Sequence, residues 1–142
     1  MAVVTDVADA IVAELNAATL SLPLTAARHY VPSFELQEMQ DLHVTVVPKA
    51  VAITKSDRSH NTQDIQIDVA VQKKFATGDA AEIDPLLTLV EEIADFFRLR
   101  RLDSYPAAHW IKTEHKPIYA QDHWDELRQF TSVLTLTFRL VR

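Results

Sequence analysis

The sequence contains no cysteine and a single glycine, and both shortages exclude familiar kinds of site. Without cysteine there is no disulfide bond, no thiolate zinc site and no cysteine nucleophile, and this absence suits a reducing compartment. Gly78 stands alone where average usage would be about 7%. Loops that cradle phosphate groups need close backbone approach and positive φ angles, which usually require several glycines. A P-loop and a dinucleotide-binding fingerprint are therefore excluded.

Long apolar runs and an excess of basic residues are also missing. No stretch approaches the roughly 20 apolar residues that span a bilayer, so no membrane partner is expected. Residues 1–20 carry acidic side chains and no basic one, and thus lack the form of a secretory signal. The formal net charge is −6. Non-specific nucleic-acid binding needs clustered Lys and Arg, so this charge argues against it as the main task.

What the chain does contain is the composition of an ordinary globular protein. Its 142 residues are 48% hydrophobic and 24% charged. This length suits one domain that covers residues 1–142 and buries a sufficient hydrophobic core without disulfide bonds or structural metal ions. No internal repeat, linker or low-complexity segment divides it. We therefore expect a single domain.

The clearest pattern in the chain is a long strand at residues Glu126–Arg142. From Phe130 to Leu140 the even positions are apolar except for Ser132, while threonines and Val133 occupy the odd positions between residues 131 and 137. This period-two alternation of β-branched and aromatic residues predicts a half-buried strand. From Arg128 to Val141 it would span roughly 45 Å. A strand this long bends, or pairs partly with something outside its own domain.

Five shorter segments also have the character of strands. They are residues 24–31, 42–47, 51–55, 63–75 and 109–118. Too few residues lie between the second and third segments for a crossover helix, so we expect these two segments to form an antiparallel pair around Pro48. Residues Pro32–Asp41 read as an irregular loop with apolar anchors at Phe34, Leu36 and Met39. Asp103–Ala108 is expected to be a turn around Pro106.

Two amphipathic helices complete the prediction. Thr5 is the expected N-cap of a first helix over Asp6–Ala18. Asp84 as N-cap and Pro85 as first residue open a second helix that runs to about Arg101. The predicted fold is α+β, a largely antiparallel β-sheet with two α-helices packed on one face, in the order α-β-β-β-β-α-β-β. The arginines at the end of the second helix are expected to be solvated and to stabilise its negative pole, namely Arg98, Arg100 and Arg101.

No pattern in the sequence identifies a catalytic, cofactor-binding or metal-binding site. The six histidines form no HxxxH or HxH pair. Asp68 precedes Lys74 as in metal-dependent nucleases, but Gln72 stands where the second acid would be. No serine has the glycines of a nucleophile elbow. We therefore expect no enzyme and no cofactor. The rival hypothesis is a small metal-dependent enzyme whose site combines distant His and acidic residues.

Candidate contact residues are easier to find. Trp110, Tyr119 and Trp124 are expected near the last hairpin loop, and aromatic side chains are typical anchors of interfaces. Core packing is an equally good interpretation for Trp110. The odd face of the last strand is the second candidate surface for a neighbouring subunit, with Thr131, Val133, Thr135 and Thr137.

Five segments of the chain carry a resemblance to known proteins. They are VADAIVAELNAA, RHYVPSFELQEMQDLHVTVVPKAVAIT, DIQIDVAVQKKF, LVEEIADFFRLRRL and PIYAQDHWDELRQFTSVLTLTFRLVR. Together they resemble small proteins encoded among the head–tail joining genes of tailed bacteriophages and prophages. The resemblance covers nearly the whole chain, and within this group the size and layout are similar to tail terminator proteins. That family has no short motif and no catalytic residues, so no residue roles are carried over.

The resemblance implies a homo-oligomeric virion protein at the tail–neck junction. Terminators form a ring, usually a hexamer, that caps the last ring of the tail tube protein and offers a docking surface for the head. The implied partners are other copies of this chain, the tail tube protein and head-completion or neck proteins. The alternative is another connector of the same region, such as a head-closure, stopper or minor tail protein. An acidic ring would also let DNA pass without specific binding, since like charge weakens phosphate contact.

Overall fold

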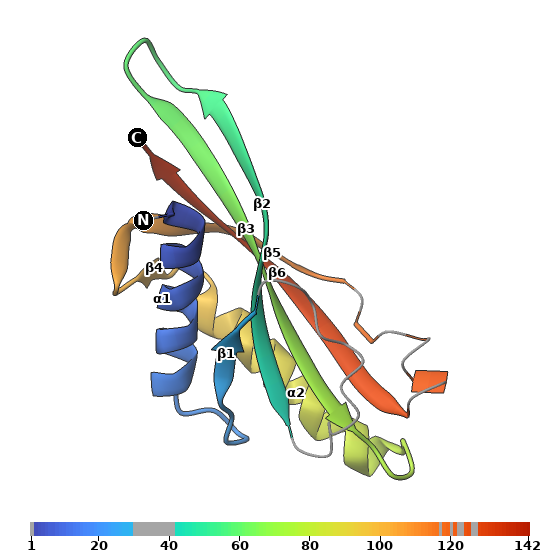
Figure 1. Ribbon diagram of the computed structural model, residues 1–142. Coiled ribbons are helices and arrows are strands. Elements are labelled where there is room, and N and C mark those ends of the chain that lie inside the picture. The colour runs from blue at the N-terminus through green and yellow to red at the C-terminus, as the bar shows by residue number, and fades with distance from the viewer. Residues whose placement is uncertain (1, 30–41, 117, 120, 122–123, 126–127) are drawn as a thin grey trace.

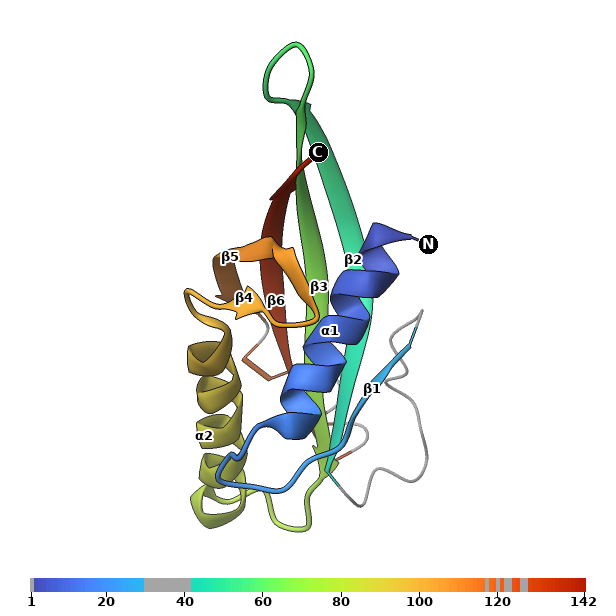
Figure 2. The ribbon, with the colours of Figure 1, turned by 90° about the vertical axis from the view of Figure 1, so that its left-hand side faces the viewer.

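The computed structural model describes residues 2–29, 42–116, 118–119, 121, 124–125 and 128–142. Its two helices both pack against one face of a six-stranded sheet, which confirms the predicted α+β fold (Figures 1 and 2). The expected loop at Pro32–Asp41 lies outside the described residues. The elements are α1 (Val3–Ala17), β1 (Ala26–Arg28), β2 (His43–Lys55), β3 (Asn61–Lys74), α2 (Ala80–Phe97), β4 (Arg101–Leu102), β5 (Tyr105–His115) and β6 (Gln129–Val141).

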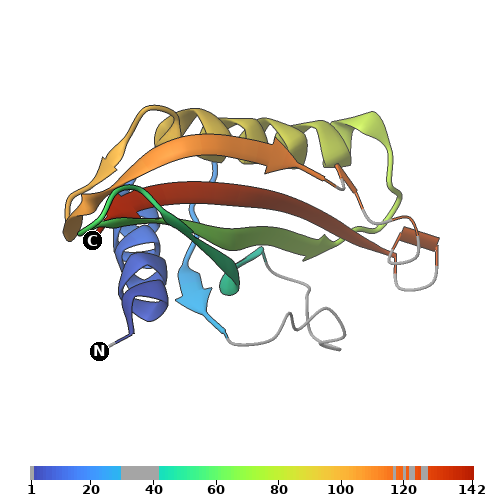
Figure 3. The ribbon, with the colours of Figure 1, turned by 90° about the horizontal axis from the view of Figure 1, so that it is seen from above.

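The sheet is centred on its two long strands, β3 and β6. The strand order is β1-β2-β3-β6-β5-β4, and all neighbours are antiparallel except β1 and β2, which are parallel. The β3–β6 register runs without a break from Thr62 opposite Val141 to Lys74 opposite Gln129. Seen from above, these strands and β5 lie side by side for most of their length (Figure 3). The last strand thus finds partners on both sides within its own sheet.

The core lies between the sheet and the helices, as the sequence periods predict. The even positions of β6 from Phe130 to Leu140 are all buried, and all except Ser132 are apolar and belong to the core. The odd apolar positions of β3 lie beside them in register. Each helix contributes one apolar stripe at helical spacing. These stripes are Val7, Ile11 and Leu15 in α1 and Leu86, Leu89, Val90, Ile93 and Phe97 in α2.

Both predicted helix starts are wrong. Helix α1 begins at Val3, and Thr5 lies inside its first turn, where its hydroxyl donates to the carbonyl of Ala2 at 2.8 Å. Helix α2 begins at Ala80, because the Asp79 side chain accepts a hydrogen bond from the backbone N–H of Glu82 at 3.1 Å. Asp79 is therefore a side-chain N-cap, while the Glu82 carboxylate accepts from the N–H groups of Ala76 and Thr77 ahead of the helix. Pro85 is therefore inside the helix rather than at its first position.

The predicted antiparallel pair around Pro48 is also wrong. Residues 42–47 and 51–55 belong to one strand, β2, which continues through Pro48 with a bulge between Pro48 and Ala50. Proline lacks a backbone donor and is tolerated at sheet edges and bulges. The same tolerance explains Pro106, which lies within β5 rather than in a turn. The chain instead turns at residues 103–104, between the short β4 and β5.

Strands β2 and β3 continue past the helices as a projecting hairpin (Figures 1 and 2). We call residues 49–60 of this hairpin the arm. Every residue of the arm is exposed. Strand β1 pairs with β2 only at residues 44–46, so it gives the arm no support. The arm is therefore the part of the described chain that extends farthest from the core.

Candidate interaction surfaces

The arm presents apolar side chains to solvent on a strand edge. Val51 is 43% exposed and Ile53 is 63% exposed. Among the described residues, no strand pairs with the outer edge of β2 beyond residue 46. An exposed edge of β-branched residues is a template for pairing with another chain. The arm thus has the features of a contact element.

The tip of the arm is an ordered turn centred on Asp57. One carboxylate oxygen of Asp57 accepts from the backbone N–H groups of Ser59 at 2.7 Å and His60 at 2.9 Å. The His60 ring also contacts this carboxylate at 2.9 Å. The pKa of Asp57 is lowered, chiefly by the hydrogen bond from Ser59 and then by that from the His60 side chain. These contacts hold the intervening Arg58 at the end of a defined turn.

Strand β3, which pairs with residues 50–55 of the arm, is anchored to β6. Arg139 Nε donates to Asp64 at 2.7 Å and its Nη2 donates to the other carboxylate oxygen at 3.0 Å. The pKa of Asp64 is lowered, first by this hydrogen bond from Arg139. Asn61 and Arg142 exchange two backbone hydrogen bonds of 2.8 and 2.9 Å. Pairing between β3 and β6 therefore reaches residue 61, and only the turn at residues 56–60 of the arm extends beyond the third strand.

The opposite edge of the sheet is also open over part of its length. Strand β4 pairs with β5 between Tyr105 and His109, and the Trp110 N–H donates to the Arg100 carbonyl at 3.2 Å. Beyond Trp110, residues 111–115 of β5 pair only with β6 within the described chain. Within its described residues, one chain therefore carries two different open edges, β2 in the arm and β5.

The threonines predicted to face a neighbour are largely covered. Thr131, Thr135 and Thr137 are 1%, 7% and 4% exposed, and Val133 is half-buried. They lie on the face of β6 opposite the core, beside longer polar side chains. The Thr135 hydroxyl donates to Asp68 at 2.6 Å. A contact on this face would therefore meet the flanking side chains before the threonines, and its role in assembly stays a prediction.

Two of the three predicted aromatic residues come together, while the third lies elsewhere. Tyr119 and Trp124 have ring centroids 5.3 Å apart, and Trp124 also packs on Phe75 at 4.6 Å. Trp110 instead stands opposite Phe138 on the helix-covered face, where its indole N–H donates to the Thr113 hydroxyl at 2.7 Å. The sequence did not single out Phe75, because it continues the buried face of β3.

Gly78 supports this aromatic cluster. Its φ is +71°, which disfavours other residues. A Cβ placed there would lie 2.9 Å from the Phe75 ring. The only glycine of the chain is thus required by a turn and by a close approach to an aromatic side chain.

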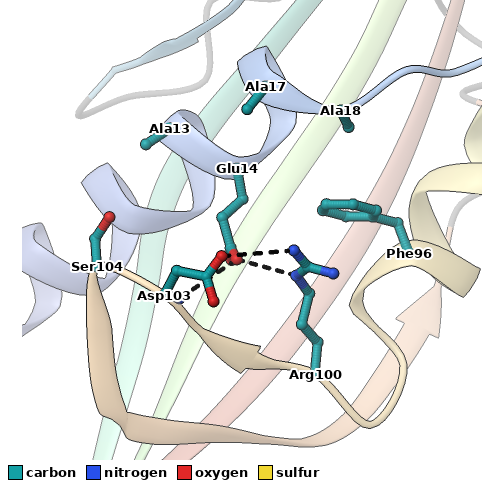
Figure 4. A pocket seen from close by; sticks show the side chains of 8 residues that line it. All are labelled: Ala13, Glu14, Ala17, Ala18, Phe96, Arg100, Asp103 and Ser104. Carbon is teal, nitrogen blue, oxygen red and sulfur yellow. Dashed lines mark hydrogen bonds and ion pairs between the residues drawn. The ribbon is translucent and has the colours of Figure 1, made fainter.

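A small pocket of about 280 Å³ lies where α1, the end of α2 and the turn after β4 meet (Figure 4). Its floor is Glu14, which is only 5% exposed. One Glu14 carboxylate oxygen accepts from Arg100 Nε at 3.0 Å and from the Asp103 N–H at 3.4 Å. The other has no hydrogen-bond partner among the described residues. The remaining lining residues are Ala13, Ala17, Ala18, Phe96 and Ser104.

Arg100 corrects the prediction that the arginines after α2 are only solvated helix-end charges. Helix α2 ends at Phe97, and Arg100 turns back over the Phe96 ring at 4.1 Å while pairing with Glu14. Arg98 and Arg101 are exposed, as predicted. Glu14 lies 86 positions earlier in the sequence. Only the tertiary fold brings the two together, so no sequence pattern could have found this pocket.

Two further observations bear on other kinds of function. Within the described ranges, no group of three or more His, Asp or Glu side chains is placed to hold a metal ion. Neither of the described helices has the length and apolar character needed to cross a bilayer. In comparisons with known proteins, no family model and no curated protein matches the chain.

Proposed function

We propose that this protein is a non-enzymatic structural protein that assembles head to tail into a closed ring. The observation that carries the proposal is the arm, which extends past the core with exposed Val51 and Ile53 on an open strand edge. The arm adds little to the stability of a monomer, because it buries little apolar surface within its own chain. Contact with another copy would cover it.

Two different open edges suit a ring better than a symmetric dimer. A head-to-tail interface joins one surface of a subunit to a different surface of the next, and it closes into a ring when the rotation allows. The edge of β2 in the arm and the edge of β5 are such a pair of different surfaces. Strand addition at either edge would provide main-chain hydrogen bonds between subunits.

Within that class, we propose the particular role of a phage tail terminator. This step rests on the resemblance of the helical and strand segments quoted above. The ring would cap the tail tube protein at the tail–neck junction of the virion and present its other side to head-completion or neck proteins. It needs no cofactor. With a net charge of −6 on each chain, DNA would pass through without specific binding.

The first experiment measures the mass of the assembled protein. Analytical ultracentrifugation over a wide concentration range should show a discrete species of several 16.1-kDa chains, and six is the expected number. Negative-stain electron microscopy of the same fraction should show rings. A protein that remains a monomer up to millimolar concentration would rule out the ring.

The second experiment separates the terminator from other connectors. Purified ring added to polymerising tail tube protein should arrest tube growth and remain at one end of each tube. Rings that bind head-completion proteins but leave tube length unchanged would instead favour a head-closure or stopper protein. Stoichiometric zinc or manganese in the purified protein would favour the metal-dependent enzyme.

A further inference from the structure

The tip of the arm carries a cation that no described residue of the same chain pairs. Arg58 is exposed at the end of the turn and forms no ion pair with any residue that the structure describes. The neighbouring carboxylate of Asp57 is occupied by Ser59 and His60. The turn therefore directs a basic side chain outward.

The Glu14 pocket contains more negative than positive charge. Two carboxylates, Glu14 and Asp103, share one guanidinium there, that of Arg100. The Asp103 side chain is 84% exposed at the mouth, while the unpaired oxygen of Glu14 is buried at the floor. A buried acceptor without a donor is costly, and the cost is relieved when a donor arrives. The pocket thus lacks one positive charge.

The walls of the pocket suit the stem of a long basic side chain. Three alanines and the Phe96 ring line it and present mostly apolar surface. Lys and Arg bury their methylene groups along apolar surfaces while keeping the charged end at a polar partner. The exposed Leu99, at 83%, follows Phe96 closely in the chain and offers further apolar surface. The arm has the complementary arrangement, with the basic Arg58 at its tip and the apolar Val51 and Ile53 behind it.

We propose that the arm of one subunit docks at the Glu14 pocket of the next, with Arg58 entering between Asp103 and Glu14. This inference rests on the proposed assembly of identical subunits. The arm projects away from the helix layer that holds the pocket, so the contact is between subunits (Figures 1 and 2). Because the arm and the pocket are different surfaces, repetition of this contact builds a head-to-tail assembly.

The first test is a charge exchange. Arg58→Glu and Asp103→Lys should each raise the subunit concentration needed for assembly by about 30-fold or more, the size expected when one partner of a charge pair at an interface is lost. The double variant R58E/D103K should recover to within about threefold of the original protein. Lys74→Glu is the matched control, because Lys74 lies at the end of β3 away from the arm and belongs neither to the pocket nor to the open edge of β5, and it should change assembly little.

The second test uses the natural absence of cysteine. Ser59 lies beside Arg58 in the tip, and Ser104 lines the pocket. A chain with both Ser59→Cys and Ser104→Cys should form a ladder of covalent multimers on oxidation, because each subunit then links to two different neighbours. Either single variant can form at most a covalent dimer and is the control. This readout works even if the charge variants fold poorly.

The outcomes separate this inference from the ring itself. If the protein assembles but its charge variants assemble normally, the docking of the arm at the Glu14 pocket is wrong. The same holds if the double-cysteine variant yields no multimers beyond dimers. Neither result contradicts the proposed ring. A protein that never assembles overturns both.

Discussion

His115 is a single residue whose titration is altered by the fold. It lies at the end of β5, shares a hydrogen bond with Ser132, and its pKa is lowered below the usual 6.5 chiefly because burial disfavours the charged ring. Folding therefore favours the neutral ring. In the pH range between the folded and unfolded values, the unfolded chain binds more protons than the folded one. The stability from this group is complete above about pH 6.5 and is lost as the pH falls.

We therefore expect the free energy of unfolding to decrease between pH 7.5 and pH 5.5, and His115→Gln to flatten this decrease. Glutamine can keep a hydrogen bond to Ser132 but does not titrate. Urea unfolding of both proteins across that range, at one protein concentration, provides the measurement. Equal slopes for the two proteins would show that His115 is not the group responsible.

At the scale of elements, we expect substitutions in the arm to weaken assembly without changing the stability of the monomer. The double change Val51→Thr and Ile53→Thr keeps β-branched residues on the strand but removes exposed apolar surface. Since both side chains are exposed, the unfolding free energy of the monomer should change by no more than about 0.5 kcal/mol. Assembly should weaken by roughly tenfold or more, because apolar contact between subunits is lost.

Thermal unfolding at low concentration and sedimentation at high concentration measure these two effects separately. Val141→Thr is the matched control, since Val141 is 55% exposed on β6 but lies outside the arm. Assembly that is equally sensitive to the control would assign the effect to general surface hydrophobicity rather than to the arm.

Strand β6 requires a different kind of experiment. A bulky charge at Thr135 would break its hydrogen bond to Asp68 and crowd a side chain that is only 7% exposed. Such a change is expected to impair folding as well as assembly, so it cannot isolate an interface. The half-buried Val133 is the more selective position on that face.

At the scale of the whole molecule, the charge balance predicts how the proposed assembly would interact with DNA. Each chain carries a net charge of −6, so several chains together form a strongly acidic particle. Fluorescence anisotropy with mixed-sequence duplex DNA at about 0.15 M salt should show no binding at micromolar protein. Micromolar affinity with a steep salt dependence would mean that basic side chains dominate the surface that DNA contacts. It would contradict the proposal that DNA passes through the ring without binding.

Sequence periodicity was informative wherever one face of an element is buried. The alternation of β3 and β6 and the stripes of both helices predicted the core correctly, because these patterns follow from backbone geometry alone. Element ends were less predictable. The Asp84–Pro85 pair has the form of a helix start, but the Asp79 N-cap begins the helix five residues earlier.

The sequence by itself determined the α+β fold, its layers and the exclusion of phosphate-binding loops, since composition and period are local properties. Only the tertiary structure decided that β2 continues through Pro48, because an edge position makes the missing donor harmless. It alone also brought Glu14 to Arg100 and left the arm outside the core. Contacts between distant residues depend on how the elements pack, and no local pattern records that packing.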